Sequence, residues 1–525
     1  RTMIDSSEQG KFRLTKDGKV YSKGKKLFPN GDKYEGEFVE GQMQGKGWMR
    51  FVNGDRYDGE FERNLYHGHG VFVWITKVDE MNQLIPGRRY DGEWKNGKFH
   101  GKGIYLIGEG DVYTGSFARG MYEGNGTLKL KNGDLYEGCW SRGLPSGKMT
   151  IKYANGDVYS GDLSVGKFNG KGKYTYSREM GWYEGDWLLG KFHGKGVRLY
   201  SNGSKYVGDF IDGEIQGEGM MFFAHGDQYL GYWKRGQMEG KGVYRYQHGD
   251  SYEGSFLQSA PYGEGKYQYA DGGYYQGEFK NLIHLNKHTG IVGAHRLPKC
   301  DGWRHGFGVR TWTSGARYEG QWVEDKMHGH GMLVNHEGAK YEGTFRNGLR
   351  SGKGTEQFGN LLGIPNCCPL GYKHHGTGYC TYTGSYRAGQ FWGTGEFKCL
   401  LGPVYKGEWE AGQRHGNGEM HFLKDGEKGD LKRQCIGGMG SLYRAESYSG
   451  AWCHNKRIGY GCLTYINGDT IQGHFEHGQP HGVHVYTFHS TAKKDRKGNK
   501  GVLVARKRGA RFVRGERVEW IDEHS

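Results

Sequence analysis

The sequence repeats one short pattern seventeen times between Tyr34 and His484. In each copy an aromatic residue, a glycine and a second aromatic residue alternate, and a Gly-any-Gly pair normally begins eleven residues after the first aromatic residue. Most successive copies start 23 residues apart, and a constant period of this size indicates a repeat array rather than a set of compact domains. The copies start at Tyr34, Tyr57, Tyr90, Tyr113, Tyr136, Tyr159, Tyr183, Tyr206, Tyr229, Tyr252, Tyr275, Tyr318, Tyr341, Tyr382, Tyr405, Tyr448 and Ile471.

The alternation within each copy predicts β-strands. Tyr34, Gly36 and Phe38 are two residues apart, so they share one face of a strand, and Gly45 and Gly47 share a face of a second strand. Asn53-Gly54 follows the second strand and is a strong signal for a tight hairpin turn. The sequence therefore predicts an all-β fold, an elongated single-layer antiparallel β-meander of about seventeen hairpin repeats.

The glycines are expected to make room for the aromatic rings, because three residues without Cβ atoms leave a flat bed on the strands. On this reasoning Gly194→Val forces a branched side chain into the bed of Tyr183 and Trp187 and destabilises the fold. Met149 and His484 replace the second glycine and mark atypical hairpins, and the last copy is degenerate enough to be a cap. The predicted core is represented by Tyr34, Gly36, Phe38, Gly45, Gly47, Tyr90, Gly92, Trp94, Gly101, Gly103, Tyr183, Gly185, Trp187, Gly194 and Gly196.

Blocks such as Tyr90-Asp91-Gly92-Glu93-Trp94 and Asn96 to Gly103 resemble the MORN-repeat family (membrane occupation and recognition nexus). The resemblance covers roughly residues 34 to 486. It implies a scaffolding role, because proteins similar to this one occur in ciliary and flagellar axonemes, notably radial spokes, and in the cortical cytoskeleton of protists.

A flat, single-layer sheet with one aromatic face leaves the aromatic side chains of that face exposed to water. We therefore expect the sheet to curl, to pack against a helix or another protein, or to form a homodimer. The chain has no run of 18 apolar residues, so no membrane span is expected. Its nine cysteines form no Cys-any-any-Cys pair, which favours a reducing compartment, the cytoplasm.

The regularity divides the chain into segments. We expect an N-terminal extension or cap at 1–33, a regular array at 34–280, an insertion loop at 281–305 and an interrupted array at 306–489. The interruptions are loops at 355–381 and 419–447, and such loops often carry specificity.

The last segment, 490–525, is a basic C-terminal tail. A net of nine positive charges lies between Lys493 and Arg517, out of +15 for the whole chain. Such a segment attracts acidic partners, namely nucleic acid, anionic lipid or acidic protein surfaces such as tubulin tails. A solvated tail or an added edge strand is the equal alternative. The candidate contacts to acidic partners are Lys493, Lys494, Arg496, Lys497, Arg506, Lys507, Arg508 and Arg511.

Two sets of residues resemble chemical sites, but neither has the arrangement that such a site needs. Histidines such as His100 and His193 precede the first glycine of the pair, which indicates a turn position, with a response to pH as the alternative. The cluster Cys367, Cys368, His374, His375 and Cys380 has zinc-ligand types but none of the usual spacings, which favours free thiols. We expect no metal, no cofactor, no nucleic acid partner and no enzyme activity.

The pattern and the resemblance together predict a structural interaction protein. We expect a non-enzymatic scaffold or spacer whose partners are other cytoskeletal or axonemal proteins, located in the cytoskeleton of a cilium or flagellum. The alternative is a peripheral membrane tether that binds anionic phospholipids through the repeats and the basic tail.

Overall fold

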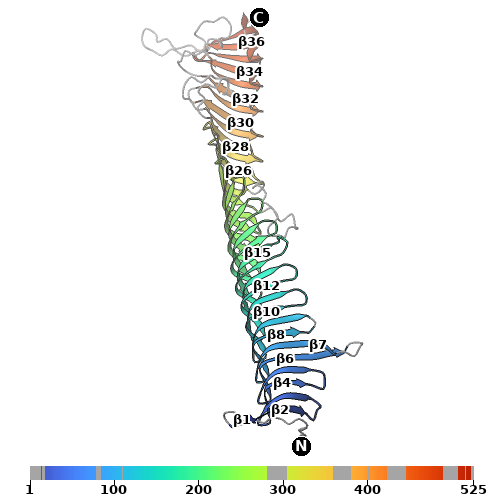
Figure 1. Ribbon diagram of the computed structural model, residues 1–525. Coiled ribbons are helices and arrows are strands. Elements are labelled where there is room, and N and C mark those ends of the chain that lie inside the picture. The colour runs from blue at the N-terminus through green and yellow to red at the C-terminus, as the bar shows by residue number, and fades with distance from the viewer. Residues whose placement is uncertain are drawn as a thin grey trace. The chain divides into compact units, whose positions relative to one another are not determined.

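The computed structural model describes residues 13–14, 18–78, 84–108, 110–280, 304–358, 380–399, 402–422, 445–488, 506–514 and 516–521. These residues form β-strands and turns, and the chain separates into two units. Unit 1 is Arg1–Gln247 with Gly290–Arg296, and unit 2 is His248–Thr289 with Leu297–Ser525. Figure 1 shows the strands of each unit following one another in a single layer.

The strands of unit 1 are β1 (Arg13–Leu14), β2 (Val20–Leu27), β3 (Lys33–Val39), β4 (Gln42–Arg50), β5 (Arg56–Glu62), β6 (Leu65–Val78), β7 (Leu84–Lys95), β8 (Lys98–Ile107), β9 (Asp111–Ala118), β10 (Met121–Lys129), β11 (Leu135–Ser141), β12 (Leu144–Lys152), β13 (Val158–Ser164), β14 (Lys167–Thr175), β15 (Gly181–Leu188), β16 (Lys191–Tyr200), β17 (Lys205–Ile211), β18 (Glu214–Phe222), β19 (Gln228–Lys234) and β20 (Gln237–Arg245).

The strands of unit 2 are β21 (Ser251–Leu257), β22 (Ala260–Gln268), β23 (Tyr274–Phe279), β24 (Arg304–Thr311), β25 (Arg317–Val323), β26 (Lys326–Val334), β27 (Lys340–Arg346), β28 (Leu349–Gln357), β29 (Cys380–Arg387), β30 (Gln390–Cys399), β31 (Val404–Glu410), β32 (Gln413–His421), β33 (Ala445–Cys453), β34 (Lys456–Tyr465), β35 (Thr470–Glu476), β36 (Gln479–Phe488), β37 (Arg506–Val513) and β38 (Glu516–Ile521).

Each strand pairs antiparallel with the next strand in the chain, from β1 to β20 in unit 1 and from β21 to β38 in unit 2. The predicted antiparallel meander is confirmed. No helix in the described part of the chain is long and apolar enough to cross a membrane.

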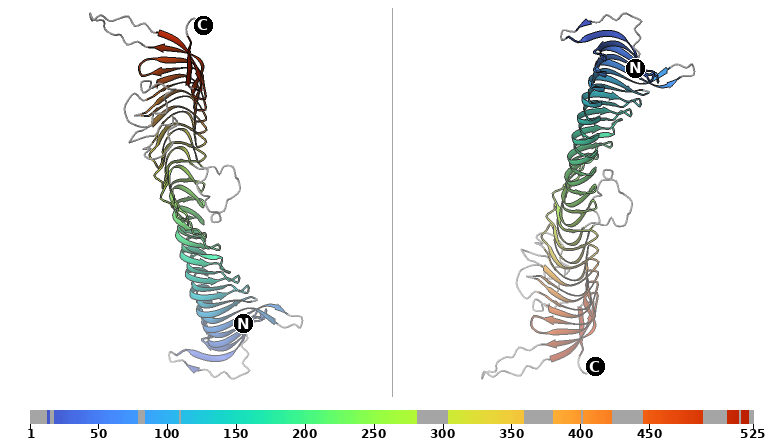
Figure 2. Two further views of the ribbon diagram at one scale, coloured as in Figure 1. Left: turned by 90° about the horizontal axis from the view of Figure 1, so that it is seen from above. Right: turned by 90° about the horizontal axis from the view of Figure 1, so that it is seen from below.

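The register places the repeat glycines opposite one another across neighbouring strands. Gly172 of β14 faces Gly185 of β15, which faces Gly196 of β16, and Gly196 faces Gly208 of β17. Beside this row the register shifts between Gly185 and Asp186, so each hairpin contains a β-bulge. Bulges bend the strand that carries them, and the strands in Figure 2 are curved.

The first tyrosines of the repeats form the core, and the chain covers them by itself. Tyr57, Tyr90 and Tyr183 of unit 1 and Tyr252 and Tyr405 of unit 2 are 0% exposed. The sequence left open whether this face is covered by curling of the sheet, by a helix or another protein, or by a second copy. The curved sheet and its own side chains are enough to bury these tyrosines. The tyrosine side therefore gives no argument for a partner, contrary to the reasoning from a flat single layer.

The described strands extend into the segments at both ends. β2 lies within the predicted N-terminal extension and pairs with β3, and β37 and β38 lie within the predicted basic tail. The edge-strand alternative therefore holds for 506–513 and 516–521. The strands also reach a few residues into the predicted loops, because β24 begins at Arg304, β28 ends at Gln357 and β29 begins at Cys380. β32 and β33 likewise reach into the predicted loop 419–447, and residues 281–303, 359–379 and 423–444 lie outside the described residues.

Candidate interaction surface

The ring of each first tyrosine lies on the two glycines that face each other across the hairpin. A Cβ atom on Gly196 would stand 2.6 Å from Cε2 of Tyr183, and one on Gly185 would stand 2.5 Å from the Cα of Gly196. The hydroxyl of Tyr183 donates to the carbonyl oxygen of Asp186 at 2.7 Å, and Tyr90 and Tyr159 make the same bond three residues ahead. Burial raises the pKa of these tyrosines above its ordinary value.

The first glycine of the Gly-any-Gly pair has a different role from the one that the pattern suggested. Gly194 has a φ of +55°, and a Cβ atom there would meet the Asp186 carboxylate at 2.7 Å rather than an aromatic ring. That carboxylate accepts the backbone N–H of Lys195 at 3.1 Å. Gly45 and Gly101 likewise have positive φ and lie beside Glu37 and Glu93. The prediction that the bed of Tyr183 includes Gly194 is wrong, because this glycine forms the bulge.

Two repeats lack the second glycine, and in both a larger side chain takes the place of the tyrosine ring. Met149 is 3% exposed and its Sδ lies near Gly138, whereas Tyr136 is only half-buried. In the last repeat His484 is 1% exposed and lies on Gly473. The strands remain paired through both hairpins, so a methionine or histidine side chain can occupy the place of the tyrosine ring without interrupting the sheet.

In unit 1, aromatic contacts and backbone hydrogen bonds join each repeat to its neighbours. Tyr183 stacks on Phe192 at 3.8 Å between ring centroids and meets Phe210 of the next repeat edge-on at 5.1 Å. Trp187 donates its Nε1–H to the carbonyl oxygen of Gly172 in the preceding repeat at 3.0 Å. Successive repeats therefore share a core rather than simply adjoining.

In unit 2, arginine replaces the stacking ring in four repeats. Arg414 faces Trp409 in the hairpin at the register position of Phe192. Its guanidinium lies 5.9 Å from the ring centroid of Tyr405 and 4.4 Å from that of Trp452. Such cation–π contacts are stronger where water is excluded. The arginines at this position are Arg304, Arg350, Arg414 and Arg457.

The same arginines also bind the turn of the following repeat. Arg304 Nε donates to Asp325 Oδ1 at 2.8 Å, and Arg457 Nη2 donates to the carbonyl oxygen of Gly478 at 2.6 Å. Arg350 Nη2 donates to the carbonyl oxygen of Gly389 in that turn at 3.2 Å. Arg350 also donates to the carboxylate of Glu356 in its own repeat, which accepts the hydroxyl of Tyr386 at 3.1 Å. The sequence pattern missed this set, although arginine recurs five residues after the second aromatic residue in three of the four repeats.

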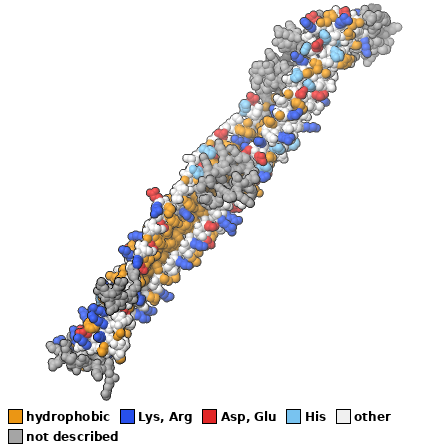
Figure 3. Space-filling model, turned by 90° about the vertical axis from the view of Figure 1, so that its right-hand side faces the viewer, with side chains coloured by type: hydrophobic (Ala, Val, Ile, Leu, Met, Phe, Trp, Pro, Cys, Tyr) orange, Lys and Arg blue, Asp and Glu red, His pale blue; other side chains and the backbone are white. Residues whose placement is uncertain are grey.

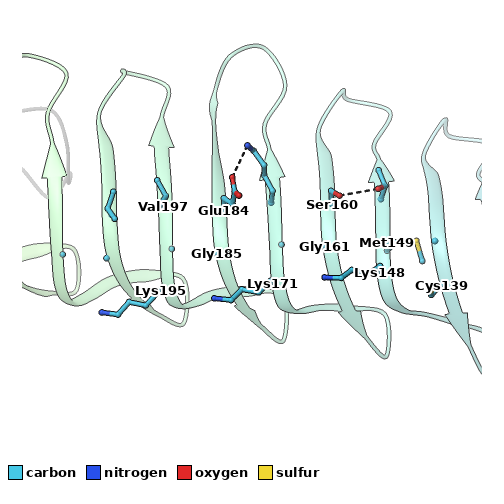
Figure 4. Close-up of a pocket in the computed structure, with 18 of the residues that line it drawn as sticks. Cys139, Lys148, Met149, Ser160, Gly161, Lys171, Glu184, Gly185, Lys195 and Val197 are labelled. Carbon is cyan, nitrogen blue, oxygen red and sulfur yellow. Dashed lines mark hydrogen bonds and ion pairs between the residues drawn. The ribbon is translucent and has the colours of Figure 1, made fainter.

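The face of the sheet opposite the tyrosines carries a groove in unit 1. It has a volume of about 1150 Å³ and runs over β10 to β19. Figure 4 shows Lys148, Lys171 and Lys195 on one side of the row of glycines and Ser160 and Glu184 on the other. Lys148 and Lys171 are ion-paired with Asp162 and Asp186 on neighbouring strands. We call this side the outward face.

One part of the outward face is apolar. Val197 of β16, Val207 of β17, Met220 of β18, Leu230 of β19 and Val243 of β20 face one another in turn across five neighbouring strands. Val207 is 39% exposed and Leu230 is 47% exposed. We call these five residues the apolar ladder. Figure 3 shows, on one side of the molecule, hydrophobic side chains gathered in a stripe with Lys and Arg side chains at its edges.

Over β27 to β30 of unit 2 the corresponding row is polar. A groove of about 1020 Å³ on the outward face is lined there by Glu342, Thr355, Thr383 and Glu396, which occupy the register positions of the ladder. The apolar ladder is therefore a local property of β16 to β20. The repeat does not require it, since the same row is polar elsewhere.

The predicted basic contacts are only partly within the described residues. Lys493, Lys494, Arg496 and Lys497 lie outside them. Arg506 begins β37, and Lys507 is an exposed residue of the same strand.

Two further basic residues of β37 make contacts inside the sheet. Arg508 lies 4.7 Å from the ring centroid of Trp520, and Arg511 is ion-paired with Glu519 at 3.2 Å. Both contacts join β37 to β38.

The structure describes only part of the cysteine and histidine residues that the sequence singled out. Cys367, Cys368, His374 and His375 lie outside the described residues, and within those residues no group of three His, Cys, Asp or Glu side chains could hold a metal ion. His100 and His193 lie on β8 and β16 opposite Glu93 and Asp186, so the predicted turn position is wrong for them. They sit at the bulge.

The repeats match a known family over most of their length. The MORN repeat model matches at residues 34–56, 57–76, 90–112, 113–135, 136–158, 159–178, 183–205, 206–228, 229–251, 252–274, 301–317, 318–338, 341–361, 382–399, 405–423, 448–470 and 472–490. The chain belongs to the MORN-repeat family. This MORN-repeat protein matches the family at seventeen places, and in the repeat that starts at Tyr275 the match covers only the second half, 301–317.

Other comparisons add little to the MORN assignment. No curated protein matches the chain. The SAS-4 (dCPAP) TCP domain of Drosophila melanogaster, solved with a proline-rich motif of Ana2, is 15% identical over 29% of this chain and 81% of that one, with a TM-score of 0.20. Virginiamycin B lyase from Staphylococcus aureus is 8% identical over 61% of this chain and 83% of that one, with a TM-score of 0.10. At these TM-scores neither carries an argument about fold or function.

Proposed function

We propose that this MORN-repeat protein is a non-enzymatic scaffold that docks other proteins of a cytoskeletal assembly, in the axoneme of a cilium or flagellum. The apolar ladder carries the proposal. Tyrosines, glycines and second aromatic residues are committed to the core, so they hold the strands at a fixed spacing. The outward rows are then free to vary from repeat to repeat, and in β16 to β20 the row is apolar, with Val207 and Leu230 exposed and the other three residues half-buried. Exposed contiguous apolar surface on a folded protein marks an interaction site.

The charges beside the ladder indicate the kind of partner. The charged residues that flank it on the same face are Lys195, Lys205, Asp209, Glu218, Lys241 and Arg245. Lys195 is ion-paired with Asp209 at 2.7 Å, and among the other four the cations outnumber the anion. An apolar row edged by cations complements a protein segment that presents apolar side chains between acidic ones. We propose that such a segment of a cytoskeletal protein is the occupant.

The decisive variant is Val207→Glu/Leu230→Glu in the full chain. Both side chains point away from the core, so the fold should be retained, whereas two carboxylates in the ladder repel an acidic, apolar segment. Proximity labelling in the native cell should give cytoskeletal neighbours with the natural chain and lose them with the variant.

The matched control is Gln276→Glu/Gln472→Glu, which adds the same two charges to the corresponding row of unit 2 at exposed positions that face no other carboxylate. This control should keep the neighbours. Identical labelling by the natural chain and the ladder variant would overturn the proposal, and so would equal loss in the control.

Membrane tethering is the second candidate, since exposed Lys507 and the basic segment before it could hold anionic headgroups, each worth about 1 kcal/mol near such a surface. Deleting 491–525 would also remove β37 and β38, so charge substitutions are the better test. Flotation with phosphatidylserine vesicles that is abolished by Lys493→Gln/Lys494→Gln/Lys507→Gln, together with membrane neighbours in the labelling, would favour the tether over the scaffold.

A further inference from the structure

Two cysteines meet at one rim of the sheet in unit 2. Cys380 is the first residue of β29 and Cys399 is the last residue of β30, and the two residues face each other directly. Their side chains are 0% and 2% exposed, and their Sγ atoms are 2.8 Å apart. This pair belongs neither to the groove nor to the apolar ladder, so it is independent of the proposed function.

The backbone geometry of the pair suits a covalent link. The N–H of Cys399 donates to the carbonyl oxygen of Pro403 at 3.2 Å, and the carbonyl oxygen of Cys380 accepts the N–H of Phe358 at 2.9 Å. Both groups therefore point away from the partner cysteine, which makes Cys380 and Cys399 a non-hydrogen-bonded pair. In such pairs the Cα atoms are about 4.5 Å apart and the side chains are closest. That separation lies within the range that disulfides span, about 4.4 to 6.8 Å.

The two cysteines replace a different pair that other repeats use at the same place. In eight of the seventeen copies the residue two before the first residue of the pattern is aspartate, and in seven of these eight the residue facing it is aromatic. Examples are Asp157 before Tyr159, whose hairpin partner position is Tyr176, and Asp250 before Tyr252, whose partner position is Tyr269. Only the hairpin of Tyr382 has cysteine at both positions among the described repeats. A pair of facing thiols requires cysteine at both positions of one hairpin, whereas the aspartate and aromatic residues of other repeats already fill these positions.

We propose that Cys380 and Cys399 form a reversible disulfide by thiol–disulfide exchange with a small disulfide of the glutathione class. One cysteine thiolate attacks the small disulfide and releases one small thiol. The other cysteine thiolate then attacks the mixed disulfide, forms the Cys380–Cys399 bond and releases the second small thiol. The two cysteines are oxidised, the small disulfide is reduced to two thiols, and the two cysteine protons end on those thiols.

The disulfide clips the open end of the β29–β30 hairpin. Residues 359–379 precede Cys380 in the chain, and residues 400–401 follow Cys399. The disulfide therefore fixes the distance between the start of β29 and the end of β30. Because both sulfurs are buried, exchange requires a local opening of the strand ends, and the oxidised hairpin should resist such opening.

The test uses the full chain equilibrated in buffers of graded reduced and oxidised glutathione, then alkylated and digested without reductant for mass spectrometry. We expect a linked pair of peptides that contains Cys380 and Cys399 and disappears on reduction. Backbone hydrogen exchange at the ends of β29 and β30 should be slower in the oxidised chain than in the reduced one.

Two variants keep the result interpretable. Cys139→Ser changes a cysteine far along the chain and should leave the linked peptides intact, whereas Cys380→Asp/Cys399→Tyr copies Asp157 and Tyr176, should fold, and should lose them. The inference is overturned if Cys380 and Cys399 remain alkylatable thiols at oxidising ratios that modify the other cysteines. It is equally overturned if either one links to a different cysteine.

Discussion

The ring of Tyr183 lies on Gly196 so closely that a Cβ atom on that glycine would stand 2.6 Å from the ring. The same contact recurs wherever a first tyrosine and a second glycine are both present, as with Tyr90 and Gly103. The missing side chain and the ring thus form one packing unit. The repeat preserves its glycines for this reason, although glycine weakens an ordinary strand.

Gly196→Val tests this unit. The valine side chain would occupy the space of the Tyr183 ring, and overpacking of this kind costs roughly 2 kcal/mol or more of unfolding free energy. Chemical denaturation of the full chain measures the loss. Lys195→Val changes the adjacent, exposed residue on the outward face and should shift stability by only about 0.5 kcal/mol or less. Equal effects of the two substitutions would contradict the packing described.

Met149→Gly tests whether Met149 occupies the place on Gly138 that a tyrosine ring takes in other repeats. With Met149 gone, the ring of Tyr136 should move onto Gly138 and become buried as in other repeats. Nitration of the folded chain followed by peptide mapping should then find Tyr136 less reactive than in the natural chain. If Tyr136 reacted more readily in the variant, the methionine would be supporting the ring and not displacing it.

The sequence was enough to predict the meander, because alternation and period act locally in every hairpin. It was not enough to separate the two glycines of the pair. Gly194 and Gly196 look equivalent in the pattern. At the bulge, however, Gly194 has a positive φ and lies beside the Asp186 carboxylate, whereas Gly196 lies under the ring of Tyr183. A bulge depends on hydrogen bonding between strands, and spacing along one strand does not reveal it.

Removing the guanidinium in Arg350→Ala should be strongly destabilising. Glu356 would remain buried without its cation, and breaking such a pair costs roughly 3 kcal/mol or more. Arg350→Phe/Glu356→Phe/Tyr386→Phe instead copies the apolar packing of Phe391 and Phe397 and should recover most of the loss in thermal melting. A triple variant no more stable than Arg350→Ala would show that arginine is needed for more than filling the position.

High pH should unfold the array through its tyrosines. Burial raises the pKa of Tyr113, Tyr341 and Tyr448 from 10.0 to about 12. The neutral phenol is therefore favoured in the folded chain. This contribution to stability is complete below pH 10, where an unfolded tyrosine also stays neutral, and it is lost as pH rises through 12. Tyrosinate absorbance should rise together with loss of β-structure in circular dichroism, and complete ionisation with the fold intact would contradict the burial.

The candidate surface was harder to foresee than the fold. Val207 and Leu230 belong to an outward row whose members are far apart in the sequence and vary in type, so no motif connects them. Their relation becomes visible only when Val207 is found opposite Met220, and Met220 opposite Leu230. The same holds for Cys380 and Cys399, which face each other across a hairpin.

The central claim is that each repeat tyrosine is sealed on its glycine pair, while the outward face stays open for binding. Nitration of the intact full chain, mapped by mass spectrometry, tests it most directly. Tyr57, Tyr90, Tyr183 and Tyr405 should be unreactive until the chain unfolds, while Tyr232, at 44% exposed, and Tyr460, at 58% exposed, should react at once. Early nitration of the first group at the rate of the second would contradict the account.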